Sequence, residues 1–544
     1  MKQKSVSKVF TNRNIYIETA LDYVPHVLTL VDRNPYSPTY GCFDREYWHY
    51  RTSDFPCGMS QENVLPLALL YTKNYPNNKW YNLERTRELA IAGIKFTVSG
   101  SHKDGTCDDY FPWERAMGAL AFTTFAATEA YMILKMDEPE IVEFFRRRCD
   151  YMLSHNETGR LSNHQALAAL SLYNTFSICG DEKYRMAAED RIALALSWQN
   201  EEGWFQEYEG ADPGYQTCTI DFLAKYYKKS GNESLIKPLF RAVEFCCYFM
   251  HPDGSYGGEY GSRNTYHYYP HGFELLAPHS KMAAALNDKY ISGIIKGKRY
   301  YNDDDRMIAH LLHNWLMAWE DFCRRDDMNT PEIPPAGIKW MPHASLVSVR
   351  KNNYHAIACM GKGGVLKVFT NDKCIVSDTG LIGRCRDKKV LVSHLLDSQN
   401  QISVNPDEGI FKVKGFFSIR KSKLSTPFKL ILFRLLNMSL GRFFPNLLRM
   451  LLQKLLITGK THTQFKFERI IRFDEKAVEI EDKIDPKAEF DSLSVGSDAT
   501  SIYVAASNVY QESVLGCKWT HAPQDVIKQK KPWIRRFEIE GEDN

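Results

Sequence analysis

The stretch Met328-Asn-Thr-Pro-Glu-Ile-Pro-Pro-Ala-Gly337 decides the fold, because the hydrophobic pattern of the chain changes on either side of it. Prolines and a closing glycine at this density are typical of a linker. Before it, from about Gln61 to Cys323, apolar residues recur at helical spacing; after it, short segments alternate between apolar and polar residues as strands do. A chain of 544 residues also exceeds what one core usually supports. We therefore expect two domains, residues 1–335 and 336–544.

The N-terminal domain is predicted to be an α/α toroid, an incomplete barrel of helical hairpins. Its candidate helices follow one another through short polar or glycine-containing turns, with no strand between them. So many paired helices in succession favour a ring over a small bundle. The predicted helices are 61–73, 83–98, 114–135, 138–153, 163–178, 182–199, 215–229, 233–250, 272–287 and 303–325.

The C-terminal domain is predicted to be an antiparallel β-sandwich, so the fold class is multidomain, helical and then β. Turn signals such as Lys351-Asn-Asn353 and Gly361-Lys-Gly-Gly364 separate its alternating segments. The predicted strands are 345–350, 354–360, 365–370, 374–378, 411–420, 464–473, 477–482 and 502–506.

Composition narrows the function and the location. The net charge of +3 is close to neutral, so the whole chain shows no nucleic-acid footprint. Aromatic residues make up 13%, which suits stacking on sugar faces, although aromatic cores are the commoner reason. Thirteen cysteines without zinc-like spacing favour a reducing compartment. Residues Met1 to Phe10 are basic but lack the apolar run of a signal peptide, so a cytoplasmic location is expected.

Two loop-to-helix junctions carry the candidate chemistry. They are Arg160-Leu-Ser-Asn-His-Gln-Ala166 and Gly210-Ala-Asp-Pro-Gly-Tyr-Gln-Thr217. An isolated His164 would more often be a core histidine, but Asn163 beside it and Tyr215 in a comparable position favour one shared pocket. These groups suit removal of a proton next to a sugar carboxylate. Asn163 can donate hydrogen bonds to that carboxylate, His164 can take the C5 proton, and Tyr215 can act as base or as the acid for O4.

A polar-aromatic loop, 257–272, is the next candidate. Arg263 can grip a uronate carboxylate in bidentate fashion. His267 and His271 can transfer protons, and Tyr260 and Tyr266 can stack on sugar rings. The competing interpretation is a buried, hydrogen-bonded loop between toroid helices. Metal binding by the two histidines lacks a third ligand in the sequence.

Two further segments could form a second wall of the cleft. One is Gly41 to Arg51, with Trp48 and Arg51; the other is Thr106 to Arg115, with Asp109, Glu114, Trp113 and Arg115. Salt-bridged structural junctions are the favoured alternative for both.

Residues 420–460 form a basic, apolar insertion. The segment carries nine Lys or Arg and no acidic residue, and Arg434, Gly441 and Pro445 interrupt its apolar runs. No run is long enough to span a bilayer. Two short amphipathic helices on an anionic membrane surface would fit, and a helical insertion packed against the toroid is the alternative.

With these residues in hand, the chain resembles the heparinase II/III-like superfamily of polysaccharide lyases, which also contains dermatan-sulfate epimerase. Those enzymes pair an α/α toroid with a β-sandwich. The resemblance implies Asn163 as carboxylate neutraliser, with His164 and Tyr215 as the base and acid. Many relatives also carry a His-x-His-x-Asp signature early in the sandwich, often with zinc. The comparable stretch, Asp378 to Arg386, has no histidine, and His343, His355 and His394 are loose substitutes.

This departure leaves the second histidine and the metal open. His267 or His271 can fill the missing catalytic role. No cofactor is required, and a structural zinc has no ligand motif to support it.

The sequence therefore predicts a lyase that cleaves a uronic-acid-containing polysaccharide by C5 proton abstraction and β-elimination. The runner-up is C5-epimerisation, which shares the first half-reaction and suits the tailoring of a surface polysaccharide inside the cell. A toroid glycoside hydrolase would use two carboxylates, drawn from Glu207, Glu209, Asp212 and Glu259. A non-catalytic sugar-binding protein would tolerate loss of His164.

Overall fold

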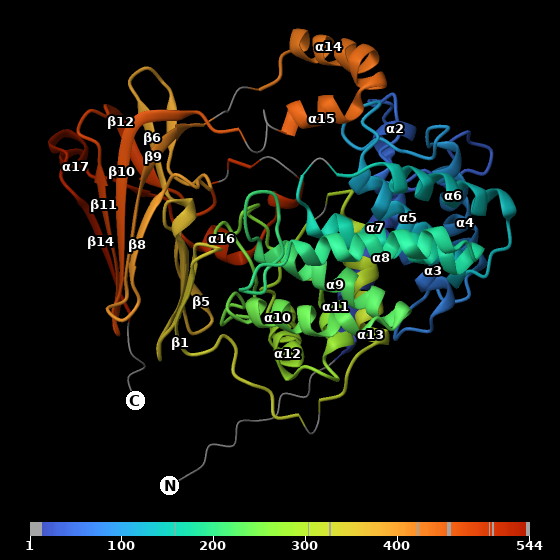
Figure 1. The fold of residues 1–544 in the computed structure, drawn as a ribbon, viewed down its shortest axis with the longest axis horizontal. Helices are drawn as coiled ribbons and strands as arrows, with labels where there is room; N and C mark the ends of the chain where they lie inside the picture. The colour runs from blue at the N-terminus through green and yellow to red at the C-terminus, as the bar shows by residue number, and fades with distance from the viewer. Residues whose placement is uncertain are drawn as a thin grey trace.

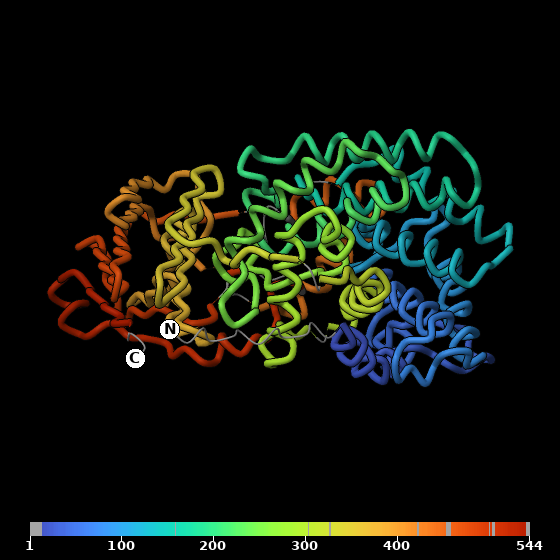
Figure 2. The backbone as a smooth tube through the Cα atoms, turned by 90° about the horizontal axis from the view of Figure 1, so that it is seen from below, coloured from blue at the N-terminus to red at the C-terminus, as the bar shows by residue number. Residues whose placement is uncertain are grey.

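The computed structural model describes residues 13–157, 159–302, 304–325, 328–420, 424–453, 459–499, 501–502 and 505–539. Its helices gather in one body and its strands in another, side by side along the longest axis in both views (Figures 1 and 2). The last long helix of the first body ends at Glu320 and the first strand of the second begins at Gly337. The change from helices to strands therefore falls on the linker Met328–Gly337.

The helical body is an α/α toroid. Consecutive helices pack as neighbours, α7 against α5, α8 and α9, and the first helix packs on the last, α1 on α13. Its elements are α1 (Asn14–Leu30), α2 (Arg45–Trp48), η1 (Met59–Asn63), α3 (Val64–Thr72), α4 (Glu84–Ser99), α5 (Met117–Ile133), α6 (Pro139–Ser154), α7 (Ser162–Cys179), α8 (Glu182–Ser197), α9 (Pro213–Ser230), η2 (Glu233–Leu235), α10 (Ile236–Cys247), α11 (Pro270–Leu276), α12 (Lys281–Ile295) and α13 (Ile308–Glu320).

Two helical predictions differ from the structure. Helix α1 was not predicted, because Pro25 interrupts its sequence, yet Ile17, Val24 and Val27 are buried at helical spacing against the rest of the toroid. The predicted helix 272–287 is two helices, α11 and α12. Pro278 lies in the break, and Ser280 then caps α12 by accepting a hydrogen bond from the backbone of Ala283.

The second body is an antiparallel β-sandwich. One sheet has five strands in the order β1 to β5; the other runs β13-β12-β6-β7-β9-β10-β11-β14, with β8 on β9. The strands are β1 (Gly337–Met341), β2 (Leu346–Arg350), β3 (His355–Cys359), β4 (Val365–Thr370), β5 (Lys373–Asp378), β6 (Leu381–Cys385), β7 (Val390–Val392), β8 (Gln401–Asn405), β9 (Ile410–Ile419), β10 (His462–Phe473), β11 (Ala477–Ile484), β12 (Phe490–Val495), β13 (Thr520–His521) and β14 (Trp533–Glu538).

The inner faces of the two sheets share one core. Val347 and Leu366 of the first sheet pack with Val413 and Ile471 of the second, and all four are fully buried. The predicted strand 502–506 is not a strand where it is described, because Ala505–Ser507 forms a 3₁₀ turn, η6; residues 503 and 504 lie outside the described part. Short helices α16 (Glu512–Gly516) and α17 (Gln524–Gln529) complete the domain.

The insertion between β9 and β10 is helical, as expected. It contains α14 (Pro427–Leu436), a π turn (Asn437–Gly441) and α15 (Pro445–Gln453), and we call residues 424–453 the hairpin. It leaves the sandwich and lies over the toroid (Figure 1), where Phe433 meets Phe111 edge-on and Arg434 pairs with Asp54 at 2.9 Å. No helix in the described ranges is long and apolar enough to cross a bilayer.

Candidate active site

A cavity of about 470 Å³ opens inside the toroid, where the hairpin forms one of its walls. It lies within the usual size range of ligand pockets. Of the predicted catalytic and substrate-binding residues, His164, Tyr215 and Arg263 line it. Residues that were not predicted also line it, among them Glu157, Tyr208, Arg306, His310 and Arg449.

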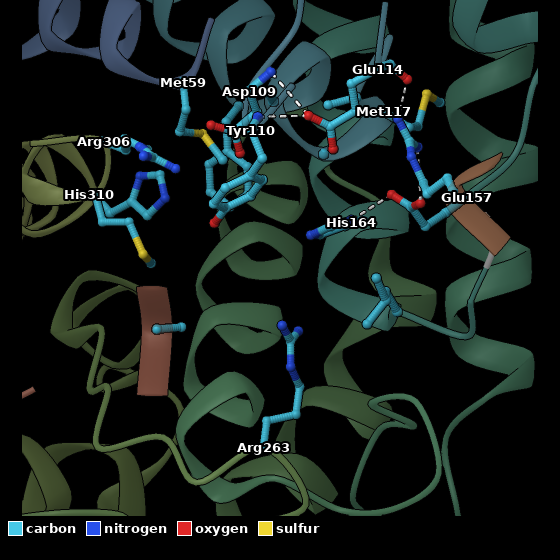
Figure 3. A pocket seen from close by; sticks show the side chains of 18 of the residues that line it. Met59, Asp109, Tyr110, Glu114, Met117, Glu157, His164, Arg263, Arg306 and His310 are labelled. Atoms are coloured by element: carbon cyan, nitrogen blue, oxygen red, sulfur yellow. Dashed lines mark hydrogen bonds and ion pairs between the residues drawn. The ribbon is translucent and has the colours of Figure 1, made fainter. Parts of the chain in front are cut away.

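His164 lies in the first turn of α7 and is oriented by a carboxylate. Its Nδ1 is 2.8 Å from Oε2 of Glu157. Because a carboxylate only accepts, Nδ1–H donates to Glu157, and in the neutral tautomer Nε2 carries the lone pair. Figure 3 shows His164 between Glu157 and the open space that Arg263 faces. The imidazole is therefore set up to accept a proton from a ligand in the cavity.

Tyr215 is held at the start of α9 by Asp212. The Asp212 carboxylate accepts hydrogen bonds from the backbone N–H groups of Tyr215 (3.0 Å) and Arg263 (2.8 Å), and Pro213 occupies the first helical turn. The Tyr215 hydroxyl makes no hydrogen bond with any described residue. Burial raises the pKa of Tyr215, and the nearby Arg263 guanidinium offsets only part of this effect. The phenol therefore stays protonated and can donate.

Arg263 is the cation closest to Tyr215. Its guanidinium lies 4.2 Å from the centre of the Tyr215 ring and 4.7 Å from that of Tyr208. Nη1 is buried without a hydrogen-bond partner among the described residues and is 3.7 Å from the Glu207 carboxylate. An unsatisfied guanidinium that lines a cavity is a ready site for a carboxylate ligand.

Asn163 does not line the cavity, although it precedes His164. It is fully buried, and its Nδ2 donates to Oε1 of Glu207 at 2.8 Å, while its Oδ1 has no partner in the described part of the chain. Burial raises the pKa of Glu207 to about 7 despite the opposing effects of Arg263 and Asn163. The structure thus places the amide behind the cavity, on a carboxyl group that faces Arg263.

A second imidazole enters the cavity from α13. His310 stacks on Phe122 with ring centres 4.2 Å apart, and the same phenyl ring meets His164 edge-on at 6.1 Å. Nδ1 of His310 pairs with Glu62, whose other oxygen is 2.9 Å from Nε2 of His313. Two imidazoles, each held by a carboxylate, therefore share one aromatic neighbour. In the sequence, the three-residue spacing of His310 and His313 within a predicted helix was the signal that could have identified this pair as a candidate.

The loop 257–272 is buried, which corrects several expectations. The Tyr260 hydroxyl shares a hydrogen bond with Nε2 of His251, and the Tyr266 hydroxyl donates to the Glu259 carboxylate. Both rings are buried, so neither is placed to stack on a sugar. His267 packs edge-on against Tyr215, and burial lowers its pKa to about 3. His271 pairs with Asp321 at 2.7 Å. None of the four is among the described residues that line the cavity.

The second wall is only partly present. Trp48 donates its indole N–H to the carbonyl of Leu30, and Arg51 lies exposed at the surface. The backbone N–H of Trp113 bonds Asp108, and Arg115 pairs with Asp104. None of these four is among the described residues that line the main cavity, and the Arg115–Asp104 pair is a contact of the kind that the salt-bridged alternative expects. Asp109 and Glu114 of the same segment do line it, and burial raises the pKa of Glu114 to about 7.

The carboxylates considered for a glycoside hydrolase do not line the cavity either. Glu207 and Asp212 are buried in the contacts given above, and Glu259 is buried against Tyr266 and Lys367. Glu209 pairs with Lys460 near the surface. In the described residues these groups hold the site together and do not face a substrate.

The sandwich does not fit a zinc site. His355 bonds Ser348 and His394 bonds Ser501, and the described strands and loops of this domain hold no group of three metal-binding side chains. In the toroid, ligand atoms of Glu62, His310 and His313 lie within 4.8 Å of one another. Two histidines and a carboxylate are a donor set that zinc accepts. One oxygen of Glu62 hydrogen-bonds His313, and the other lies in an ion pair with Nδ1 of His310, so the three side chains also contact one another directly.

The whole chain has been compared with known proteins. No protein-family model matches it, and no curated protein sequence matches it either. Among solved structures, chondroitin AC lyase of Streptomyces coelicolor A3 aligns over 91% of this chain and 69% of its own, at 10% identity and a TM-score of 0.53.

Two other lyases align at similar identity. Paenibacillus xanthan lyase matches 89% of this chain at 11% identity and a TM-score of 0.51, and this chain spans about half, 47%, of that protein. Heparinase III aligns at 9% identity over 90% of this chain and 79% of its own; its TM-score of 0.48 adds no weight. At these identities the likeness concerns the fold. The chain has the α/α-toroid and β-sandwich fold of polysaccharide lyases, as its sequence predicts.

Proposed function

We propose that this protein is a polysaccharide lyase that cleaves a uronic-acid-containing polysaccharide by β-elimination. The observation that carries the proposal is the meeting of three groups in one cavity: a histidine whose Nδ1 is held by Glu157, a protonated phenol, and an arginine whose Nη1 has no hydrogen-bond partner among the described residues. Removing the proton next to a carboxylate needs a base and a cation, and expelling O4 needs an acid.

The reaction follows from these positions. Arg263 binds the uronate carboxylate and stabilises the charge that develops when C5 loses its proton. His164 takes that proton at Nε2, and Glu157 stabilises the imidazolium that forms. The electron pair then forms the C4–C5 double bond, the C4–O4 bond breaks, and Tyr215 donates its proton to O4. The product is an unsaturated sugar and a shortened chain.

Asn163 has a different role in this proposal from the one predicted from the sequence, which was direct contact with the substrate carboxylate. Since its Nδ2 holds Glu207, and Glu207 faces Arg263, Asn163 acts on the substrate carboxylate through these two side chains. The acidic polysaccharide as partner and the cytoplasmic location remain predictions from the sequence.

Proton NMR of uronate polymers incubated with the protein in heavy water tests the proposal. We expect new signals of an unsaturated sugar with the wild type. They should be absent with Tyr215→Phe and with His164→Gln. A panel of uronate polymers that all stay unchanged, in chain length and in deuterium content, would refute it.

C5-epimerisation is the second candidate, and His310 is the observation that favours it. Inversion needs a group that returns a proton to the opposite face of C5. His310 and its partner Glu62 supply a second imidazole on the ring of Phe122, which His164 also contacts.

Deuterium at C5 without cleavage would identify the epimerase. In that case His310→Gln should keep exchange on one face and lose inversion, because His164 is intact. If His310→Gln instead removes a bound metal, detected by elemental analysis of the purified protein, the imidazole holds an ion and transfers no proton.

A further inference from the structure

The hairpin exposes a concentration of large apolar side chains. Of 26 such exposed side chains in the described part of the chain, 13 lie within its 30 residues. Phe428 and Phe443 are 74% and 71% exposed, and Ile431 and Phe444 are 60% and 58% exposed. Single exposed apolar residues are ordinary, but a contiguous group marks a surface that meets another apolar phase or molecule.

The charge of the same segment indicates what covers it. Residues 420–460 carry nine Lys or Arg and no Asp or Glu. Within the hairpin, Lys429 and Arg442 make no ion pair with a described residue, whereas Arg434 and Arg449 pair with acids of the toroid. Apolar side chains interspersed with unpaired cations complement the headgroups and acyl chains of anionic lipids.

The hairpin has an inner and an outer side. On the inner side, Phe433, Arg449 and Leu452 line the cavity, and Arg449 donates to the carbonyl of Glu114 at 2.8 Å and pairs with Glu157. In the view of Figure 1, α14 lies on the outside of the molecule and α15 lies between it and the toroid. The outer side is free to meet a surface while the inner side stays on the cavity.

We propose that the outer side of the hairpin docks on the surface of an anionic phospholipid bilayer. Helices of ten and nine residues cannot span a bilayer and lie flat at its interface. Docking would bring the wall of the cavity to the lipid surface. The position of the cavity then defines the substrate class, and this step rests on the proposed function. The substrate is a uronate-containing glycan held at the lipid surface, such as one attached to a lipid.

Sedimentation with lipid vesicles tests the docking. The full chain is mixed with vesicles of phosphatidylcholine plus phosphatidylglycerol, and with vesicles of phosphatidylcholine alone. We expect binding to the first and little to the second. The double variant Phe443→Ser/Phe444→Ser should bind the anionic vesicles roughly 100-fold more weakly, since two exposed rings no longer enter the interface. Lys429→Gln/Arg442→Gln should weaken binding on the order of tenfold or more.

The matched control is Leu515→Ser/Ile534→Ser. These side chains are 71% and 58% exposed, the same as Phe443 and Phe444, but lie in the sandwich domain away from the hairpin. This variant should bind vesicles as the wild type does. Equal losses in both double variants, or equal wild-type binding to neutral and anionic vesicles, would overturn the proposal.

Self-association is the remaining outcome. If sedimentation without vesicles shows a dimer that Phe443→Ser/Phe444→Ser abolishes, the outer side is an interface between two copies, and lipid docking is refuted. The vesicle assay needs no substrate, and cleavage of soluble oligosaccharides needs no vesicle. Failure of the docking and failure of the proposed function are therefore distinguishable.

Discussion

His164 and Tyr215 have different surroundings, and these assign their roles. A carboxylate at Nδ1 orients the imidazole of His164 and stabilises the imidazolium that forms once the ring has taken a proton. No described carboxylate hydrogen-bonds the Tyr215 hydroxyl, and burial holds the pKa of Tyr215 above the usual value. The sequence left base and acid open between the two residues. The contacts of each side chain favour the imidazole as base and the phenol as acid.

Replacing Tyr215 with Phe should remove the acid and keep the fold. We expect kcat to fall about 10²- to 10⁴-fold, the usual size of a general-acid contribution, with the melting temperature nearly unchanged. Tyr208→Phe is the control, because Arg263 also stacks on that ring. Steady-state assays that show equal losses for both variants would mean that the aromatic ring, and not the hydroxyl of Tyr215, matters.

Gly118 leaves room for the His164 ring. A Cβ at this position would lie 2.7 Å from Cε1 of His164, which is closer than real Cβ atoms come, and a tight 3.2 Å from both ring nitrogens. Gly118→Ala should therefore push the imidazole away from its working position and lower kcat at least tenfold, by order of magnitude. Gly516→Ala, where a Cβ meets nothing within 4 Å, should leave kcat unchanged in the same assay.

Glu207 should make stability depend on pH. Burial raises its folded-state pKa to about 7 from the ordinary value of 4.5. The folded state then holds a proton that the unfolded state has lost, so its contribution is complete below the unfolded pKa and is lost as the pH rises through about 7. Between about pH 5 and about pH 8, the free energy of unfolding of the wild type should fall by about 2.5 kcal/mol relative to Glu207→Gln.

Urea unfolding at both pH values measures this difference. Glu209→Gln is the control, since Glu209 is about half exposed and pairs with Lys460. A constant gap between wild type and Glu207→Gln across the range would show that Glu207 is already ionised at the lower pH.

At the scale of elements, the hairpin is attached to the toroid by pairs of unequal strength. Arg449 is largely buried and bonds two partners at the cavity, whereas the Arg434–Asp54 pair is exposed on both sides. Exposed pairs contribute little, while breaking a buried one leaves an unpaired charge. The α15 end is therefore the firm attachment and the α14 end the weak one.

Arg449→Met should loosen the hairpin and open the wall of the cavity. We expect faster hydrogen exchange in residues 424–453 and a several-fold higher KM, because one cation and one wall are lost. Asp54→Asn removes only the exposed pair and should leave both quantities near the wild type. Unchanged exchange in Arg449→Met would show that Phe433 and its neighbours hold the hairpin by themselves.

At the scale of the whole molecule, the sandwich supports the loop that carries Arg263. Lys362, in the turn after β3, is buried and donates to the carbonyls of Glu259 and Gly261 and to the side chain of Asn264. Lys367 of β4 pairs with the Glu259 carboxylate at 3.1 Å. Two lysines of one domain therefore fasten the polar loop of the other.

Lys362→Met should act on the site through this loop. Three acceptors lose their donor, so we expect a melting temperature several degrees lower, by order of magnitude, and a higher KM as Arg263 loses its position. Lys412→Met, which removes a half-exposed lysine of the sandwich that pairs with Glu468, is the control. A lower melting temperature without any change in KM would limit the sandwich to stability.

The sequence by itself determined the order of the domains, most of the helices and strands, the helical insertion, and the candidates His164, Tyr215 and Arg263. These follow from local signals: hydrophobic period, turn residues, and side-chain chemistry at helix starts. Helix α1 was not predicted because Pro25 interrupts its helical hydrophobic pattern. Strands as short as β7 and β13 contain too few residues to show the apolar–polar alternation of a strand.

Only the tertiary structure decided which side chains face the cavity. His267 and His271 have the same chemistry as His310, and all three are buried, yet of these only His310 lines the cavity. Likewise Tyr215 lines it and Tyr260 does not. Residues as distant as Glu157, His310 and Arg449 meet because the toroid closes and the hairpin folds over it. Such contacts depend on long-range packing, which no local pattern in the chain encodes.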